Sequence, residues 1–136
     1  MVKIIFVCGG NVARSQMAEA YYNHFTNSHD ATSAGISATT PIQYPILPGI
    51  IVDVMQEDGI DISRQKVKQI TNEMINLADI IIVIREKSLH TSLLIENPKT
   101  IYWNIEDPYK TTIYETREIR DIIKKHVVDF IKRNTL

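Results

Sequence analysis

Residues 2–15 read VKIIFVCGGNVARS, and this stretch decides the fold class of the chain. Its first part, residues 2–7, is apolar apart from Lys3, and the pair Gly9-Gly10 follows shortly after it. A run this short and this apolar is typical of a strand that is buried on both faces. Because a helical pattern begins directly after the glycines, we predict a strand, a glycine-rich loop and a helix in succession.

Strand and helix patterns alternate along the rest of the chain. Short apolar runs predict further strands at Ile80–Ile84, at Thr100–Trp103 and at residues 31–33 together with the residues just before them. Helical spacing is shown by Met17, Ala18, Tyr21, Tyr22 and Phe25, by residues 50–55 ahead of the helix stop Asp58-Gly59, and by Ile119, Ile122, Ile123, Val127, Phe130 and Ile131. This alternation favours an α/β domain with a parallel sheet, and 136 residues suit one domain over 1–136.

The composition excludes several classes of protein. Fifteen Lys and Arg residues against sixteen Asp and Glu residues give a net charge of −1, which offers no overall field for nucleic acid or an anionic membrane. No apolar run approaches the roughly 20 residues of a membrane span, and the N-terminus lacks the pattern of a signal peptide. With one cysteine, Cys8, no disulfide can form within the chain. We therefore expect a cytoplasmic protein without nucleic-acid or membrane partners.

The loop after the first strand has the composition of an anion cradle. Glycines let the backbone approach a ligand closely, and asparagine tolerates the left-handed region better than most residues. A loop curled in this way points successive N–H groups inward, and the helix that follows adds the positive end of its dipole. The N–H groups that would bind the anion belong to Gly9, Gly10, Asn11, Val12, Ala13 and Arg14.

Cys8 and Arg14 add chemistry to this cradle. The same N–H groups would stabilise a Cys8 thiolate, and the Arg14 guanidinium can hold two anion oxygens bidentately. A nucleophile, an oxyanion cradle and a guanidinium clamp are the parts that phosphoryl transfer to sulfur requires. The alternatives are a Cys8 that is only a small core residue and a phosphopeptide-binding module without catalysis.

The sequence resembles the low-molecular-weight protein tyrosine phosphatase family, which shares its fold with the thioredoxin-coupled arsenate reductases. The matching segments are VCGGNVARSQMAEA at 7–20, TSAG at 32–35, DGIDIS at 58–63, ADIIIVI at 78–84 and EDPY at 106–109. They cover nearly the whole chain in the family's order. The resemblance implies a four-stranded parallel sheet flanked by helices, flavodoxin-like in strand order. It also implies hydrolysis of phosphotyrosine or small aryl phosphates through a cysteinyl-phosphate.

The resemblance also implies roles for individual residues. Asp107 would be the general acid that protonates the leaving phenolate, and then the base that activates water. Ser15 would hydrogen-bond the Cys8 sulfur, although a helix N-cap is its other interpretation. Ser33 would hold Asn11 and so lock the loop. Tyr109 would line the pocket for the phenyl ring, and phosphate or sulfate would bind in the loop.

Two departures from the family keep a second activity open. Many of these phosphatases have a second cysteine where this chain has Ala13, and most have proline where it has Gln16. The run RSQMAE is closer to the arsenate reductases, but their thioredoxin-coupled relay needs further cysteines that this chain lacks. The alternative is therefore an arsenate reductase that uses an external small thiol.

No cofactor or metal is expected from the motifs. The chain has neither the Gly-Lys-Ser/Thr end of a nucleotide-binding P-loop nor a G-x-G-x-x-G. The histidines at 24, 29, 90 and 126 show no ligand spacing, and one cysteine cannot form a zinc site.

Overall fold

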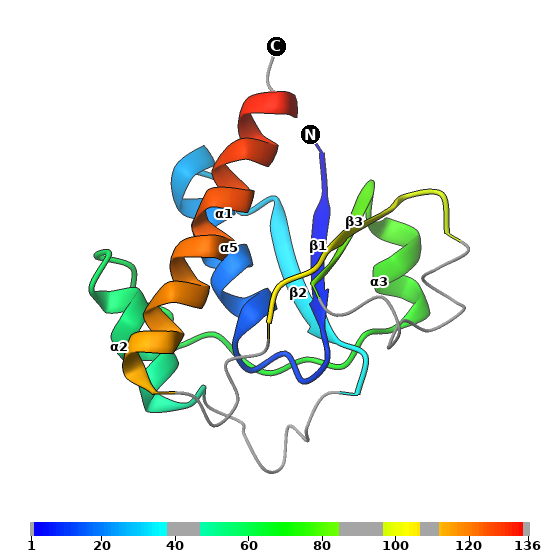
Figure 1. The fold of residues 1–136 in the computed structure, drawn as a ribbon. Coiled ribbons are helices and arrows are strands. Elements are labelled where there is room, and N and C mark those ends of the chain that lie inside the picture. The colour runs from blue at the N-terminus through cyan, green and yellow to red at the C-terminus, as the bar shows by residue number, and fades with distance from the viewer. Residues whose placement is uncertain (1, 38–46, 85–96, 107–111, 135–136) are drawn as a thin grey trace.

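The computed structural model describes residues 2–37, 47–84, 97–106 and 112–134 (Figure 1). In chain order its elements are β1 (Ile4–Cys8), α1 (Arg14–Thr26), β2 (Ala31–Gly35), α2 (Gly49–Gln56), α3 (Asn72–Leu77), β3 (Ile80–Ile84), β4 (Thr100–Trp103) and α5 (Ile113–Asn134).

The four strands form one parallel sheet in the order β2-β1-β3-β4. This order confirms the four-stranded, flavodoxin-like sheet that the resemblance implied. β1 lies between β2 and β3, and it pairs with both along most of its length. Because all strands run the same way, their carboxyl ends share one edge of the sheet, where ligands bind in this class of fold.

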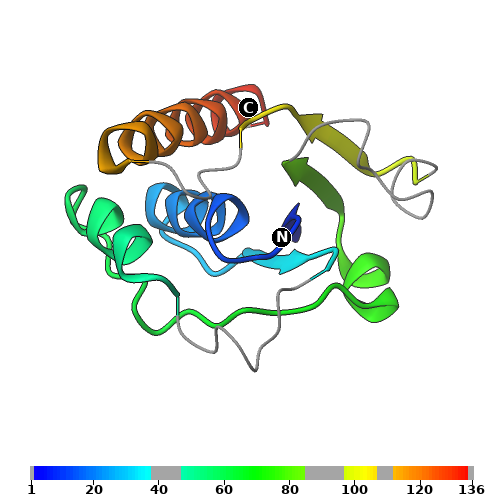
Figure 2. The same cartoon turned by 60° about the horizontal axis from the view of Figure 1, so that its bottom comes forward.

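Helices cover both faces of the sheet, so the strands are apolar on both sides (Figure 2). Alternate residues of β1 point to opposite faces, as the two-residue period of a strand requires. Ile4 and Phe6 join the core under α1, α2 and α5, whereas Ile5 and Val7 join the smaller core under α3. This double burial explains why β1 is apolar at nearly every position.

Two side chains in the predicted stripes of α1 and α5 are not in the core. Phe25 is 43% exposed in the last turns of α1, where its ring stacks on Tyr21 with the centroids 5.8 Å apart. Ile122 is 46% exposed, because it lies one position before Ile123 and so faces outward from α5. Of the other members of the C-terminal stripe, Ile119, Ile123, Val127 and Phe130 lie in the core, and the partly buried Ile131 packs against it.

Both ends of β2 and the helix α3 also differ from the prediction. The strand at residues 31–33 extends downstream to Gly35, not upstream, because residues 27–30 form the turn that leaves α1. In that turn Asn27 is left-handed with a φ of 50°. The sequence patterns did not predict α3, a six-residue helix that begins after Thr71. The Thr71 side chain accepts a hydrogen bond from the Met74 N–H and caps this helix.

In the described part of the chain, no helix combines the length and the apolar character needed to cross a membrane.

Candidate active site

Cys8 is the last residue of β1, and the loop that follows curls back over its sulfur. The loop covers residues 9–13, and α1 begins at Arg14. Asn11 adopts the left-handed conformation predicted for it, with a φ of 58°. In this conformation its backbone N–H donates a hydrogen bond to Cys8 Sγ, with a donor–acceptor distance of 3.2 Å. The sulfur is therefore buried at the base of the loop, 2% exposed as a residue.

Ser15 makes the second polar contact to the sulfur. Its Oγ lies 2.9 Å from Cys8 Sγ, and the Asn11 side-chain amide donates to the same oxygen at 2.7 Å. Because this oxygen accepts from Asn11, its own proton is available for donation to the sulfur. The N-cap interpretation of Ser15 is wrong, since the N-cap position is Ala13 and no side chain caps α1.

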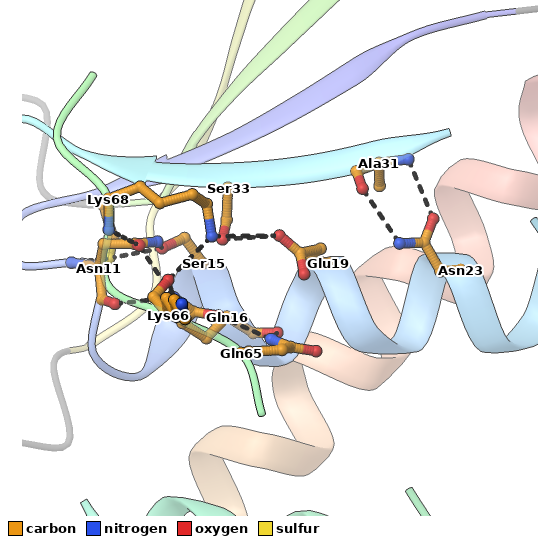
Figure 3. Close-up of polar contacts among 11 residues, drawn as sticks. Asn11, Ser15, Gln16, Glu19, Asn23, Ala31, Ser33, Gln65, Lys66 and Lys68 are labelled. Atoms are coloured by element: carbon orange, nitrogen blue, oxygen red, sulfur yellow. Dashed lines mark hydrogen bonds and ion pairs between the residues drawn. The ribbon is translucent and has the colours of Figure 1, made fainter. Parts of the chain in front are cut away.

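The predicted contact between Ser33 and Asn11 is also wrong. Ser33 Oγ donates to Glu19 Oε1 at 2.9 Å, one turn of α1 beyond Ser15 (Figure 3). The sheet register explains the difference, since Gly35 is the residue of β2 that pairs with Cys8. Ser33 lies two residues before Gly35, about 7 Å back along the strand from the loop.

Asn11 is held instead by a segment from another part of the chain. Asn11 Oδ1 accepts hydrogen bonds from the backbone N–H of Lys68 and from Gln16 Nε2, both at 2.8 Å. The backbone donor settles the orientation of the Asn11 amide, with its oxygen toward Lys68 and its nitrogen toward Ser15. Hydrogen bonds to Lys68 and to the first turn of α1 therefore hold the loop before any ligand binds.

Behind this contact lies an ion pair between Glu19 and Lys68. Lys68 Nζ is 3.8 Å from Glu19 Oε1. Burial raises the pKa of the Glu19 carboxyl, an effect that Lys68 and the Ser33 hydroxyl partly oppose. Burial likewise lowers the pKa of the Lys68 ammonium, and the charge of Glu19 opposes that shift.

Gly35 packs directly against the back of the loop. A Cβ at this position would lie 2.8 Å from Gly9 O and 3.0 Å from Asn11 N. The residues after it continue the contact, because Ile36 N–H donates to Cys8 O and Ser37 N–H donates to Gly9 O. The glycine of the TSAG segment therefore lets the backbone of β2 approach the backbone of the loop closely, because it has no side chain.

Arg14 links the loop to the segment that follows β4. The residue is 7% exposed, and its Nη1 donates to the carbonyl of Ile105 at 3.1 Å. Ile105 precedes Asp107 by two residues in the sequence. Asp107 and Tyr109 themselves lie outside the described residues, so their predicted roles stay predictions.

Within the described ranges, no group of three or more His, Cys, Asp or Glu side chains could hold a metal ion.

The sequence reasoning missed Lys68, Gln16 and Gly35 as parts of the site. For Gln16 there was a signal, because an amide replaced the usual proline directly after Ser15. Gly35 belongs to the TSAG segment, but the segment gives no sign that this glycine packs against the loop. Nothing near Lys68 in the sequence indicates that its backbone would reach Asn11, 57 residues away.

Comparisons with known proteins show the family of this chain. Residues 3–135 match the family described as "Low molecular weight phosphotyrosine protein phosphatase". A probable low molecular weight protein-tyrosine-phosphatase, EpsP, from Ralstonia solanacearum is 32% identical over 143 residues, covering 98% of this chain and 97% of the relative. An arsenate reductase from Brevibacillus brevis is 33% identical, covering 93% and 92% respectively.

Solved structures show the same fold. A low molecular weight protein tyrosine phosphatase from T. tengcongensis superposes with a TM-score of 0.84 at 24% identity, over 98% of this chain and 99% of that one. An arsenate reductase in the phosphate binding state superposes with a TM-score of 0.83 at 26% identity, over 99% and 100%. The chain therefore belongs to the low molecular weight phosphotyrosine protein phosphatase family.

Proposed function

We propose that this protein hydrolyses phosphotyrosine and small aryl phosphate monoesters through a cysteinyl-phosphate. One observation carries the proposal: the sulfur of Cys8 lies at the base of a loop that donates to it from the Asn11 backbone and presents Ser15 to it. Such donors stabilise a thiolate, which is the nucleophilic form of cysteine. On this proposal residues 1–136 act as one catalytic domain.

In the first step the Cys8 thiolate attacks phosphorus in line with the leaving phenolate oxygen. The S–P bond forms as the P–O bond breaks, and Asp107 transfers its proton to the departing oxygen. The backbone N–H groups of residues 9–14 and the Arg14 guanidinium stabilise the charge on the three equatorial oxygens. The hydrogen bond from Arg14 to the Ile105 carbonyl orients the planar guanidinium toward these oxygens.

In the second step water displaces the sulfur from phosphorus. Asp107, now a carboxylate, takes a proton from the attacking water, and orthophosphate leaves the loop. Ser15 donates to the sulfur at 2.9 Å, so it stabilises the thiolate as the S–P bond breaks. Tyr109 would line the pocket that receives the phenyl ring. In this mechanism the chain supplies the first nucleophile, the acid, the base and the anion donors, and water is the second nucleophile.

Arsenate reduction with an external small thiol is the second candidate. It is favoured by the Brevibacillus brevis relative named arsenate reductase, which is 33% identical to this chain. The same loop would hold arsenate, and the Cys8 thiolate would attack arsenic in place of phosphorus. One small thiol would then attack the Cys8 sulfur, which releases arsenite and leaves a mixed disulfide on Cys8. A second small thiol would reduce that disulfide and restore Cys8, because the chain has no second cysteine to do so.

The deciding experiment compares both reactions in the wild type and in Cys8→Ser. Hydrolysis of p-nitrophenyl phosphate is measured with a metal chelator present, and arsenite formation is measured with glutathione as the small thiol. We expect hydrolysis by the wild type, none by Cys8→Ser, and no thiol-dependent arsenite. Weak hydrolysis together with clear arsenite formation would overturn the phosphatase proposal in favour of the reductase.

The location we propose is a reducing cytoplasm. The proposed mechanism starts from Cys8 as an unoxidised thiolate, and reducing compartments maintain that state.

A further inference from the structure

Gln16, the residue where this chain departs from the usual proline, has a side chain that is fully buried beside the loop. Its exposed fraction is 0%, although it lies only two residues into α1. A buried side-chain amide is costly unless its donors and acceptor are all satisfied. The contacts of this amide therefore indicate what holds it there.

The nitrogen of the Gln16 amide contacts three oxygen acceptors. Gln16 Nε2 lies 2.8 Å from Asn11 Oδ1, 3.1 Å from Asn11 O and 2.8 Å from Lys66 O (Figure 3). Its two N–H groups thus serve three acceptors, one N–H being shared between two of them. Two of these acceptors belong to Asn11, the left-handed residue whose N–H donates to Cys8. The third acceptor is the carbonyl of Lys66. Two residues further on, the backbone N–H of Lys68 also donates to Asn11.

The oxygen of the same amide is fixed as well. Gln65 Nε2 donates to Gln16 Oε1 at 2.6 Å. With carbonyl acceptors at the nitrogen and an amide donor at the oxygen, only one orientation of the Gln16 side chain satisfies every group.

We propose that Gln16 is a positioning residue for the phosphate loop: its amide holds Asn11 left-handed and thereby aims two donors at the Cys8 sulfur. The first donor is the Asn11 N–H itself, at 3.2 Å from Sγ. The second is the Ser15 hydroxyl, which accepts from Asn11 Nδ2 and keeps its own proton available for the sulfur. A proline at position 16 would have no amide with which to make these contacts.

The inference rests on the proposed function only in that it concerns the same loop. Gln16 does not touch the reacting atoms, so its effect should be seen in the state of Cys8 and in anion affinity, not only in stability. A side chain that merely fills space would change the unfolding temperature and leave the loop of the folded protein as it is.

The test compares Gln16→Met, which keeps the volume and removes the polar atoms, with Gln16→Glu, which keeps the shape and places a carboxylate against three acceptors. Gln65→Met is a milder variant, because Gln65 is only half-buried. Gln56→Met is the matched control, since Gln56 is exposed at the end of α2. Two quantities are measured on folded protein: the affinity for inorganic phosphate by calorimetry, and the pH profile of Cys8 alkylation by iodoacetamide.

We expect both Gln16 variants to bind phosphate roughly tenfold or more weakly, with Gln16→Glu the worse of the two. The alkylation midpoint should move to higher pH in both variants, slightly so in Gln65→Met, and should not move in Gln56→Met. Unchanged phosphate affinity and an unchanged alkylation profile in the Gln16 variants, with only a lower Tm, would overturn the inference. If these variants fail to fold, an unchanged profile in Gln65→Met overturns it.

Neither measurement requires turnover, so failure of the proposed function is a separate outcome. A wild type that hydrolyses no aryl phosphate, but whose alkylation profile depends on Gln16, would refute the phosphatase proposal and support the positioning role.

Discussion

At the scale of single residues, the geometry of the site depends on how closely two backbones approach. Gly35 of β2 lies against Gly9 and Asn11 of the loop, at distances that leave no room for a methyl group. A side chain here would have to displace loop backbone, which cannot yield as the end of a flexible side chain can. The position of the N–H groups over Cys8 therefore depends on a residue that carries no chemistry of its own.

We predict that Gly35→Ala lowers kcat/KM for p-nitrophenyl phosphate by roughly tenfold or more, because it shifts the loop by a few tenths of an ångström. Overpacking should also lower the free energy of unfolding by about 1–3 kcal/mol. Gly49→Ala is the matched control, since a Cβ at Gly49 would meet nothing within 4 Å. Steady-state kinetics and urea unfolding check both variants. Full activity in Gly35→Ala would show that the close approach does not control the loop.

The proposed role of Asp107 also belongs to the residue scale. Replacement by asparagine removes the proton but keeps the shape, so Asp107→Asn should slow hydrolysis most where the leaving oxygen is most basic. For phenyl phosphate we expect a loss of about 10²–10⁴-fold. The loss should be smaller for p-nitrophenyl phosphate, whose phenolate leaves more easily without protonation. Rates measured across a series of substituted phenyl phosphates decide the matter, and a loss that is equal for all of them would contradict the acid role.

At the scale of elements, a set of polar contacts ties α5 to the end of α2 and to α1. The Tyr21 hydroxyl of α1 donates to Asp58 Oδ2 at 2.6 Å, and Lys124 Nζ of α5 lies 3.4 Å from the same oxygen. Nearby, Arg120 of α5 donates to the carbonyl of Val54 in α2 at 2.9 Å. The hydrogen bond from Tyr21, followed by the charge of Lys124, holds the pKa of the Asp58 carboxyl below its ordinary value of 3.8.

This pKa shift predicts how the stability depends on pH. A carboxyl whose pKa is lowered on folding stabilises the native state above its ordinary pKa, and that contribution is lost as the pH falls toward the folded value. We therefore expect Asp58→Asn to cost about 1–2 kcal/mol of unfolding free energy at pH 7. The difference from wild type should shrink as the pH falls below about 4. Urea unfolding at pH 7, 5, 4 and 3 measures it. Asp53→Asn, at an exposed position of α2, is the control, and a difference that stays constant with pH would contradict the prediction.

At the scale of the whole molecule, aromatic rings join the sheet to the helices above it. Trp103 at the end of β4 lies 5.7 Å from the ring of Phe6 in β1 and 6.3 Å from the ring of Phe130 in α5, measured between centroids. Tyr22 of α1 lies 6.3 Å from Phe130. These contacts hold α5 over β1, and β1 carries Cys8 at its end.

We predict that Phe130→Ala lowers the free energy of unfolding by about 3–5 kcal/mol, because the 8% exposed ring leaves a cavity between α5, α1 and β4. Trp103 is the single tryptophan of the chain, so its fluorescence reports the unfolding transition. Phe25→Ala is the control, because that ring is 43% exposed and should cost only about 1 kcal/mol. Equal losses for the two variants would show that the aromatic contacts over the sheet contribute little.

The helices show which features of this molecule sequence patterns can predict. The stripe from Ile119 to Ile131 predicted α5, because the apolar period of a long helix is a strong signal. The same pattern could not show that Ile122 faces outward or that Gln16 is buried. Burial of a residue on a helix depends on which elements pack against it, and the segment that covers Gln16 is distant in the chain.

The residue pattern alone predicts the strand, the loop and the start of the helix within residues 2–15, and it identifies Cys8 as the candidate nucleophile. These features depend on neighbouring residues: the apolar run, the glycines and the tolerance of Asn11 for left-handed backbone. Which residues hold that loop depends on the packing of the folded chain. The register that pairs Cys8 with Gly35 moves Ser33 away from Asn11, and the packing of residues 65–70 brings Lys68 to it. Such contacts join positions far apart in the chain, and they form only when the whole sheet and its helices have assembled.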